Sequence, residues 1–496
     1  MQNHFTVRGI PQSLAADSWW LDSSDDTTRA PEVNKKSEQR RSWASYSKLP
    51  ILGVLILVLV ADFLFWQQSL GLSVALYAIV IFCVSTHKVS LKSRIGPLLL
   101  LVFGAMPVIE YIQLLSILFL CVSLAIALIW AHQPNIKNSK YTTAMFRLLA
   151  ALPVSGLTAL FGYIQCLRSG AQGTGSDALK GFARNWAFPI GGSLVFFTLL
   201  VDANPFFAQV LSVDVDVLAL LNRIAFWFGL WVLIWPLADG FTFDDRDFSI
   251  PNNPMRLPNL GLNAASVFRA LVMFNLLIGV QTCLDLSIFV GGGDLPDGMS
   301  YASYAHRGAY PLVITALLAG AFAISARPFL QHHRLLKPLL LLWLAQNVAL
   351  CVSAGLRLEL YIDVYGLTYS RVRALIWMGV VALGLSLTAW QIIHAHSNRW
   401  LILHCSALGA STLYICCFVN FAAMIATVNI PHHQASAYYL CELGPTAHQA
   451  ITDGVRAARA GSHEVGYLRE LEACRPDAPT IDGWRDWGLR KWRIAA

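Results

Sequence analysis

Charge is scarce in this sequence. Only 13% of its 496 residues are Asp, Glu, Lys or Arg, while 56% are hydrophobic, and a typical soluble domain is about 25% charged. This composition excludes an ordinary soluble protein. Apolar runs near 20 residues recur along the chain, and a helix of that length crosses a bilayer. The sequence therefore predicts an all-α fold, a polytopic transmembrane helical bundle.

Several chemical signatures are also missing. The ten cysteines form no CxxC pair, and there is no Walker loop, dinucleotide fingerprint, nucleophile elbow or kinase motif set. The pairs His332–His333 and His432–His433 are adjacent rather than four residues apart, so neither presents two metal ligands on one helical face. We therefore predict no catalytic residue, no cofactor and no metal site. The net charge of +7 indicates a basic cytoplasmic face rather than nucleic-acid binding.

The first 49 residues are polar and end in a basic cluster between Lys35 and Lys48. We expect a disordered arm, with no cleavable signal peptide, that the positive-inside rule holds in the cytoplasm. The region 50–429 is the predicted transmembrane domain, with about eleven spans. The predicted spans are Pro50–Trp66, Ser69–Thr86, Gly96–Ile109, Ile112–Ala131, Trp186–Asn204, Ile224–Gly240, Ala265–Val290, Tyr310–Ala326, Pro338–Leu356, Val372–Ile393 and Trp400–Val428.

Met145–Cys166 is a twelfth candidate. It is apolar, but a proline and two glycines interrupt it, and Arg168, Lys180 and Arg184 follow it. A span would place those three cations outside, so we favour an interfacial or re-entrant helix and leave the twelfth span open. With eleven spans the N-terminus lies in the cytoplasm, the C-terminus lies outside, and every strongly basic connection is cytoplasmic.

Residues 430–496 form a polar, extracytoplasmic C-terminal tail with a helical pattern. It is too short for us to expect much of a core. Cys441 and Cys474 lie in this tail, apart from the eight cysteines in or beside apolar segments. An outside tail permits a disulfide between them, and both the paired and the unpaired state stay open.

The most unusual stretch runs from Arg357 to Arg371. It places two arginines, two acids and three tyrosines between two long apolar segments, where charged groups are costly. Gln346, Ser353 and Arg357 fall on one helical face, and Tyr361 continues it. A polar stripe of this kind is expected to face the interior of a bundle or a cavity.

The same stretch has a sufficient structural interpretation. Gly366 suits the C-terminal end of a helix, and Thr368 can cap the next one. We therefore expect a helix–break–helix hairpin at the outer interface. Arg357 would pair with Glu359, with Asp363 or with a neighbouring segment.

The functional alternative is a site for an anion or a lipid headgroup. A second segment, near Tyr304 and His306, lies on the same outer side in the predicted topology. Its tyrosines fit an aromatic belt at the interface, and together with the hairpin it would form one composite polar surface. The candidate ligand-binding residues are Arg357, Glu359, Tyr361, Asp363, Arg371, Arg373, Tyr301, Tyr304 and Arg307.

Asp297–Gly308 and Arg357–Arg371 resemble the signature of a bacterial polytopic membrane family. That family is known only as a domain of unknown function, the DUF4153/DUF4173-like group. Asp202–Phe206 and Tyr438–Leu440 are similar to it too, and the likeness runs from about residue 185 to the end. The resemblance implies a bacterial inner-membrane protein and supplies no activity, substrate or catalytic residue.

The leading hypothesis is a non-enzymatic inner-membrane protein, a sensor or scaffold, whose partners are the bilayer and a small anionic or lipid-type ligand. No nucleic-acid partner is predicted, and the residues point to no particular protein partner. A secondary transporter is one alternative and would need a cavity that reaches both faces. A membrane-embedded transferase on lipid-linked groups is another, with Glu359, Asp363 or His306 as its base.

Overall fold

The structure is a computed structural model. It describes residues 48–134, 217–238, 263–291, 301–331, 333–432, 435–460 and 465–495, with scattered positions between 141 and 200. Over these residues it consists of helices and has no strand, which confirms the predicted all-α class. The predicted arm lies outside the described residues except for its last two positions. Met145–Cys166 and Trp186–Asn204 are described only at scattered positions.

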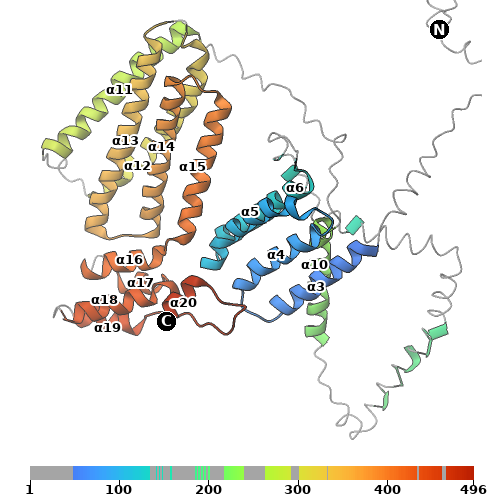
Figure 1. Cartoon of the computed structure of the whole chain (residues 1–496). Helices are drawn as coiled ribbons and strands as arrows, with labels where there is room; N and C mark the ends of the chain where they lie inside the picture. Colours follow the sequence, from blue (N-terminus) through green and yellow to red (C-terminus); the bar gives the residue numbers. More distant parts are fainter. Residues whose placement is uncertain are drawn as a thin grey trace, which may run out of the picture.

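Five helices form the first of two helix groups (Figure 1). Each overlaps a predicted span, because the apolar runs that mark a span also favour a buried or lipid-facing helix. Leu57, Phe82 and Leu101 are among the side chains that fill the interior of this group. The helices are α3 (Lys48–Phe65), α4 (Leu72–Ser85), α5 (Leu91–Glu110), α6 (Leu114–His132) and α10 (Val217–Ala238).

An ion pair joins α3 to α10. The carboxylate of Asp62 accepts hydrogen bonds from Arg223 Nε at 3.0 Å and Nη2 at 2.5 Å, and from Trp227 Nε1 at 2.8 Å. This two-bond fork is the strongest geometry for such a pair. Asp62 lies near the end of α3 and Arg223 near the start of α10, so these two helix ends lie side by side.

The second group contains five further helices (Figure 1). Leu271, Leu340 and Leu344 are fully buried in its core, and the rings of Phe274 and Trp343 stack there at 5.4 Å. The helices are α11 (Ala264–Gly291), α12 (Tyr301–Ala326), α13 (Leu336–Tyr365), α14 (Tyr369–Ile393) and α15 (Asn398–Phe418). The largest differences from the predicted spans are in α12, which begins nine residues earlier, and in α13, which ends nine residues later.

Apolar side chains also cover the outside of both groups. Leu59, Leu318 and Leu403 are 64%, 64% and 66% exposed. Among the described residues, seven helices are long and apolar enough to cross a membrane, and three shorter helices are apolar as well. A bilayer solvates such a surface, whereas water does not.

A layer of short helices, which we call the cap (residues 421–495), lies below the second group in Figure 1. The helices of the cap are α16 (Phe421–Asn429), α17 (Ala437–Cys441), α18 (His448–Ala460), α19 (Val465–Ala473) and α20 (Leu489–Ala495). Buried Ile425, Leu440 and Ile451 pack together with Leu367 and Val372 of the second group. The expectation that the tail lacks much of a core is therefore wrong, because the cap shares a hydrophobic core with the helices that it covers.

The last predicted span, Trp400–Val428, is interrupted in the structure. Helix α15 ends at Phe418, and α16 begins three residues later. Asn420 makes the break: its side-chain oxygen accepts from Ala423 N at 3.2 Å, and its amide donates to Thr446 O at 2.9 Å. A side chain that caps one helix and ties it to the cap stabilises a change of direction at this point.

Candidate functional site

The hairpin at residues 357–371 has the predicted local form. Helix α13 ends at Tyr365 and is followed by Gly366, which has φ 77° and ψ 173°, a conformation that is essentially restricted to glycine. Thr368 then caps α14 by accepting a hydrogen bond from Arg371 N at 3.5 Å. Helix α13 therefore stops, and helix α14 starts, at the glycine and the threonine that the sequence predicts for these positions.

Side chains of the cap form hydrogen bonds with the backbone of the turn in this hairpin. Asn429 is fully buried; its oxygen accepts from Leu367 N at 2.7 Å and its amide donates to Leu367 O at 2.8 Å. Tyr439 OH accepts from Tyr369 N at 3.1 Å. Because buried backbone groups must be hydrogen-bonded, these contacts satisfy the residues that break the helix. The turn is a docking point for the cap.

One of the candidate arginines, Arg371, satisfies carbonyls at the end of α13, whereas Arg373 contacts the first turn of its own helix α14. Arg371 donates to Tyr365 O at 2.8 Å and to Gly366 O, and its guanidinium lies 4.2 Å from the centre of the Tyr361 ring. Arg373 donates to Tyr369 O at 3.3 Å. Cations at the C-terminal end of a helix stabilise its unpaired carbonyls and its dipole. Both arginines thus have structural contacts, and Arg373 is still exposed.

The remaining hairpin candidates separate into a buried and an exposed set. Arg357 is 7% exposed and lies on the face of α13 that also buries Ser353, as the spacing predicts. Glu359 and Asp363 are exposed. The two acids named for a transferase base therefore lie at the surface of the protein.

The second candidate segment lies in the first turns of α12. Tyr301, Tyr304 and Arg307 belong to this helix, while their side chains, and that of His306, lie outside the described residues. The composite surface that would join them to Arg357 stays a prediction.

A buried ion cluster, which the sequence did not reveal, joins the end of the chain to both helix groups. Glu110, at the end of α5, is 3% exposed, and its Oε1 accepts from Arg490 Nε at 3.2 Å and from Arg493 Nη2. Arg490 is 6% exposed and also donates to Cys417 O of α15 at 2.8 Å. One arginine of the cap thus contacts α5 of the first group and α15 of the second. Its partner Glu110 is 380 residues away in sequence.

The segment before α20 lies across the start of α4. Leu72 N donates to Trp487 O at 2.8 Å, and Ser73 N donates to Arg485 O at 3.1 Å. The approach requires glycine at position 71, because a Cβ there would lie 2.2 Å from the carbonyl carbon of Asp486. The cap therefore satisfies two of the free N–H groups at this helix start.

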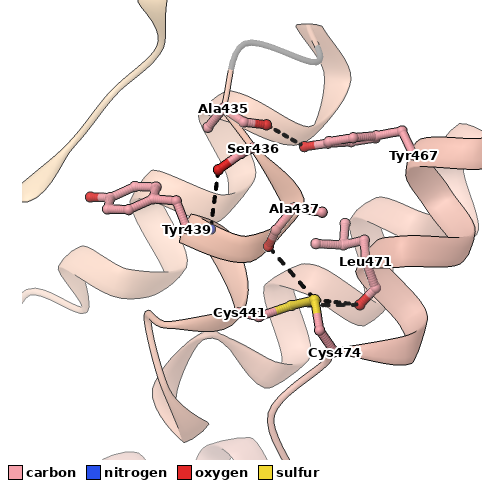
Figure 2. The surroundings of a disulfide bond; sticks show 8 residues. All are labelled: Ala435, Ser436, Ala437, Tyr439, Cys441, Tyr467, Leu471 and Cys474. Atoms are coloured by element: carbon pink, nitrogen blue, oxygen red, sulfur yellow. Dashed lines mark hydrogen bonds between the residues drawn. A yellow bond between two sulfur atoms is a disulfide. The ribbon is translucent and has the colours of Figure 1, made fainter.

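A disulfide links two helices of the cap (Figure 2). It joins Cys441, at the end of α17, to Cys474, which follows α19, with the Cα atoms 5.8 Å apart. Tyr467 OH donates to Ala435 O at 3.0 Å beside it. This is the pair that the sequence left open, and it fixes α19 against α17.

Polar side chains also lie inside the second helix group. Asn275 of α11 donates to Leu271 O at 2.7 Å and to Leu339 O at 3.1 Å, and Gln346 of α13 donates to Asn275 O at 3.3 Å. The side-chain oxygens of Asn275, Gln346 and Asn347 are buried and have no hydrogen-bond partner among the described residues. Within the described part of the chain, no group of three His, Cys, Asp or Glu side chains could hold a metal ion.

The apolar outer surface and the long apolar helices define a helical membrane protein. The chain belongs to the family described as "Domain of unknown function (DUF4153)", whose family model matches residues 97–454. This confirms the family resemblance seen in the sequence, although the match begins well before residue 185 and ends within α18. Comparison with curated proteins and with solved structures finds no match.

Proposed function

We propose that this protein is an integral protein of the bacterial inner membrane, with its N-terminus in the cytoplasm and its cap in the periplasm. The cap contacts the start of α4, the end of α5, the α13–α14 turn and the end of α15. The opposite ends of these helices are joined by connections that carry cations and no acid. The positive-inside rule assigns such connections to the cytoplasm. Their cations are Lys88, Lys92, Arg94, Arg327, Arg334, Lys337 and Arg399.

The same arrangement supports the proposed count of eleven spans. Ten described helices are apolar, and α6 begins beside the cap and so ends on the cytoplasmic side. Helix α10 begins on the cap side, because Arg223 near its start bonds Asp62 near the end of α3. On this topology the chain between His132 and Val217, most of which lies outside the described residues, is expected to cross an odd number of times. A single crossing there, at the predicted span Trp186–Asn204, accompanies the predicted interfacial helix at Met145–Cys166.

Reporter fusions test this orientation. A fluorescent protein fused after Gln331 is expected to fold and fluoresce, because that connection lies in the cytoplasm. Alkaline phosphatase fused after Ala496 is expected to be active, since the enzyme needs the oxidising periplasm. The swapped fusions serve as controls and should be inactive. Fluorescence at both positions, or phosphatase activity at both, would refute the topology.

For its role, we propose a non-enzymatic sensor or scaffold that binds a small anionic or lipid-type ligand at the outer face, through the hairpin and its arginines. The observation that carries the proposal is the double contact of Arg490 with Glu110 of α5 and Cys417 O of α15. Because the cap is bound to both helix groups, a movement of the cap would shift both groups. A sensor or scaffold needs such a coupling between the part that binds and the rest of the protein.

Replacing Arg357 tests the ligand site. Arg357→Lys keeps the charge and loses the planar fork that binds phosphate through two hydrogen bonds. We expect a folded variant that binds short-chain phosphatidylglycerol at least tenfold more weakly in calorimetry. Arg357→Ala should lose the same binding, and Arg399→Lys, an exposed change at the opposite end, should retain it. Loss of folded protein in both Arg357 variants would instead indicate a structural ion pair.

A secondary transporter is the second candidate, and one observation favours it. The side-chain oxygens of Asn275, Gln346 and Asn347, which lack a partner in the described part of the chain, are polar atoms buried on α11 and α13. Polar groups buried within a membrane protein line many substrate pathways. Flux through proteoliposomes that is unchanged by Asn275→Leu would count against this function.

A further inference from the structure

A cavity lies between the cap and the ends of the first helix group. It has a volume of about 210 Å³, smaller than the roughly 300 Å³ at which drug-sized sites begin. We call it the junction cavity. Its walls are both apolar and polar and include Leu70, Val108, Ile112, Tyr111, Asp486 and Lys491.

Asp486 gives the junction cavity an unsatisfied acceptor. The residue is 4% exposed, and its Oδ1 has no hydrogen-bond partner among the described residues, while Oδ2 lies 3.5 Å from Lys491 Nζ. A buried carboxylate oxygen without a donor costs free energy. Ser73 Oγ and Arg485 Nε, which lie behind the cavity wall rather than in it, are also buried with no partner in the described part of the chain. Among the residues that line the cavity, Asp486 thus lacks a donor that a bound polar molecule would supply.

Lys491 supplies the opposite charge on the same wall. Its ammonium group carries three N–H donors, and one contact to Asp486 leaves others for a second partner. Its side chain is 27% exposed, so it can turn toward an anion in the cavity. A ligand that satisfies both residues must carry a cationic N–H donor for Asp486 and an anionic oxygen for Lys491, a few bonds apart.

We propose that the junction cavity binds the ammonium and phosphate groups of an aminophospholipid headgroup. Leu70, Val108 and Ile112 form the apolar side of the cavity, at the level where α3 ends and α6 begins. A lipid headgroup meets its acyl chains at this level, so the apolar wall faces the first carbons of the lipid. The small volume suits a headgroup. This site is separate from the hairpin and holds for either orientation of the cap.

Calorimetry and native mass spectrometry of the full-length protein in detergent test this proposal. The probes are short-chain phosphatidylethanolamine, phosphatidylcholine and phosphatidylglycerol, with free phosphoethanolamine to separate a lipid from a soluble ligand. Phosphatidylethanolamine should bind at least tenfold more tightly than phosphatidylcholine, because methylation removes every N–H donor from the ammonium. Free phosphoethanolamine, which gains nothing from the apolar wall, should bind more weakly than the lipid.

Two variants and a control locate the site. Asp486→Asn should lose at least tenfold in affinity for phosphatidylethanolamine, whereas Asp453→Asn, in an exposed ion pair of α18, should change it less than twofold. Ile112→Trp fills the cavity without altering charge and should also abolish binding, so it decides the matter even if Asp486→Asn does not fold. Phosphatidylcholine binding as tightly as phosphatidylethanolamine, unchanged phosphatidylethanolamine binding in Ile112→Trp, or free phosphoethanolamine binding as tightly as the lipid would overturn the proposal.

Discussion

Glu110→Gln is expected to release the end of the cap and to lower the free energy of unfolding by about 3–5 kcal/mol. The substitution keeps the shape of the side chain and removes the negative charge between Arg490 and Arg493. Arg490 is then a buried charge without a counterion. Detaching α20 exposes that charge to water, so the segment that carries Arg490 should undock first. Thermal unfolding in detergent and protease cleavage after Arg490 measure the two effects.

A double-mutant cycle isolates the interaction. Arg490→Met removes the charge that Glu110→Gln leaves unpaired, so the double variant should be more stable than the sum of the two single changes predicts. Glu470→Gln, an exposed acid in α19, should leave the melting temperature unchanged. Strict additivity of the two changes would show that Glu110 and Arg490 do not interact.

Cys474→Ser is expected to destabilise the cap by about 4 kcal/mol. The disulfide joins residues separated by 33 positions, and closing a loop of this length in the unfolded chain accounts for an effect of that size. Helix α19, whose Leu468 and Leu471 are buried in the cap core, should open first. The expected signs are a lower melting temperature and faster trypsin cleavage at Arg469, an exposed residue of α19.

Reduction provides the internal comparison. Dithiothreitol should lower the melting temperature of the wild-type protein and leave that of Cys474→Ser unchanged, because the variant has no disulfide to lose. Cys83→Ser, which removes an exposed free thiol of α4, should behave like the wild type. A dithiothreitol effect of equal size in Cys474→Ser would assign the stabilisation to another cause.

The hairpin shows which features of the structure could be predicted from the sequence and which could not. Gly366 and Thr368 were predictable as helix end and helix start, because backbone conformation and capping depend on neighbouring residues. Asn429, which holds Leu367, and Tyr439, which holds Tyr369, were not predictable. The first contact joins residues that are 62 positions apart in sequence, and the second joins residues that are 70 positions apart. No local pattern encodes a pairing over such a distance.

The contacts between the cap and the first helix group were even less predictable from the local sequence. Glu110 reads in sequence as an ionised residue at the end of a span, where charge is cheap. Glu110 is buried only because the folded chain brings Arg490 against it. Asp486 and Lys491 likewise read as ordinary tail charges, and the junction cavity exists only where the tail crosses the ends of α3 and α5.

The sequence by itself determined the all-helical class, the membrane environment, the family and the local form of the hairpin. Each of these depends on composition or on residues within a few turns, where apolar length, periodicity and capping decide the outcome. Only the tertiary structure decided that the tail is a cap with a shared core, that Arg371 serves a helix end, and that Glu110 and Asp486 are buried. Burial and ion pairing depend on what packs nearby in space, and the chain brings those partners together from up to 383 residues away.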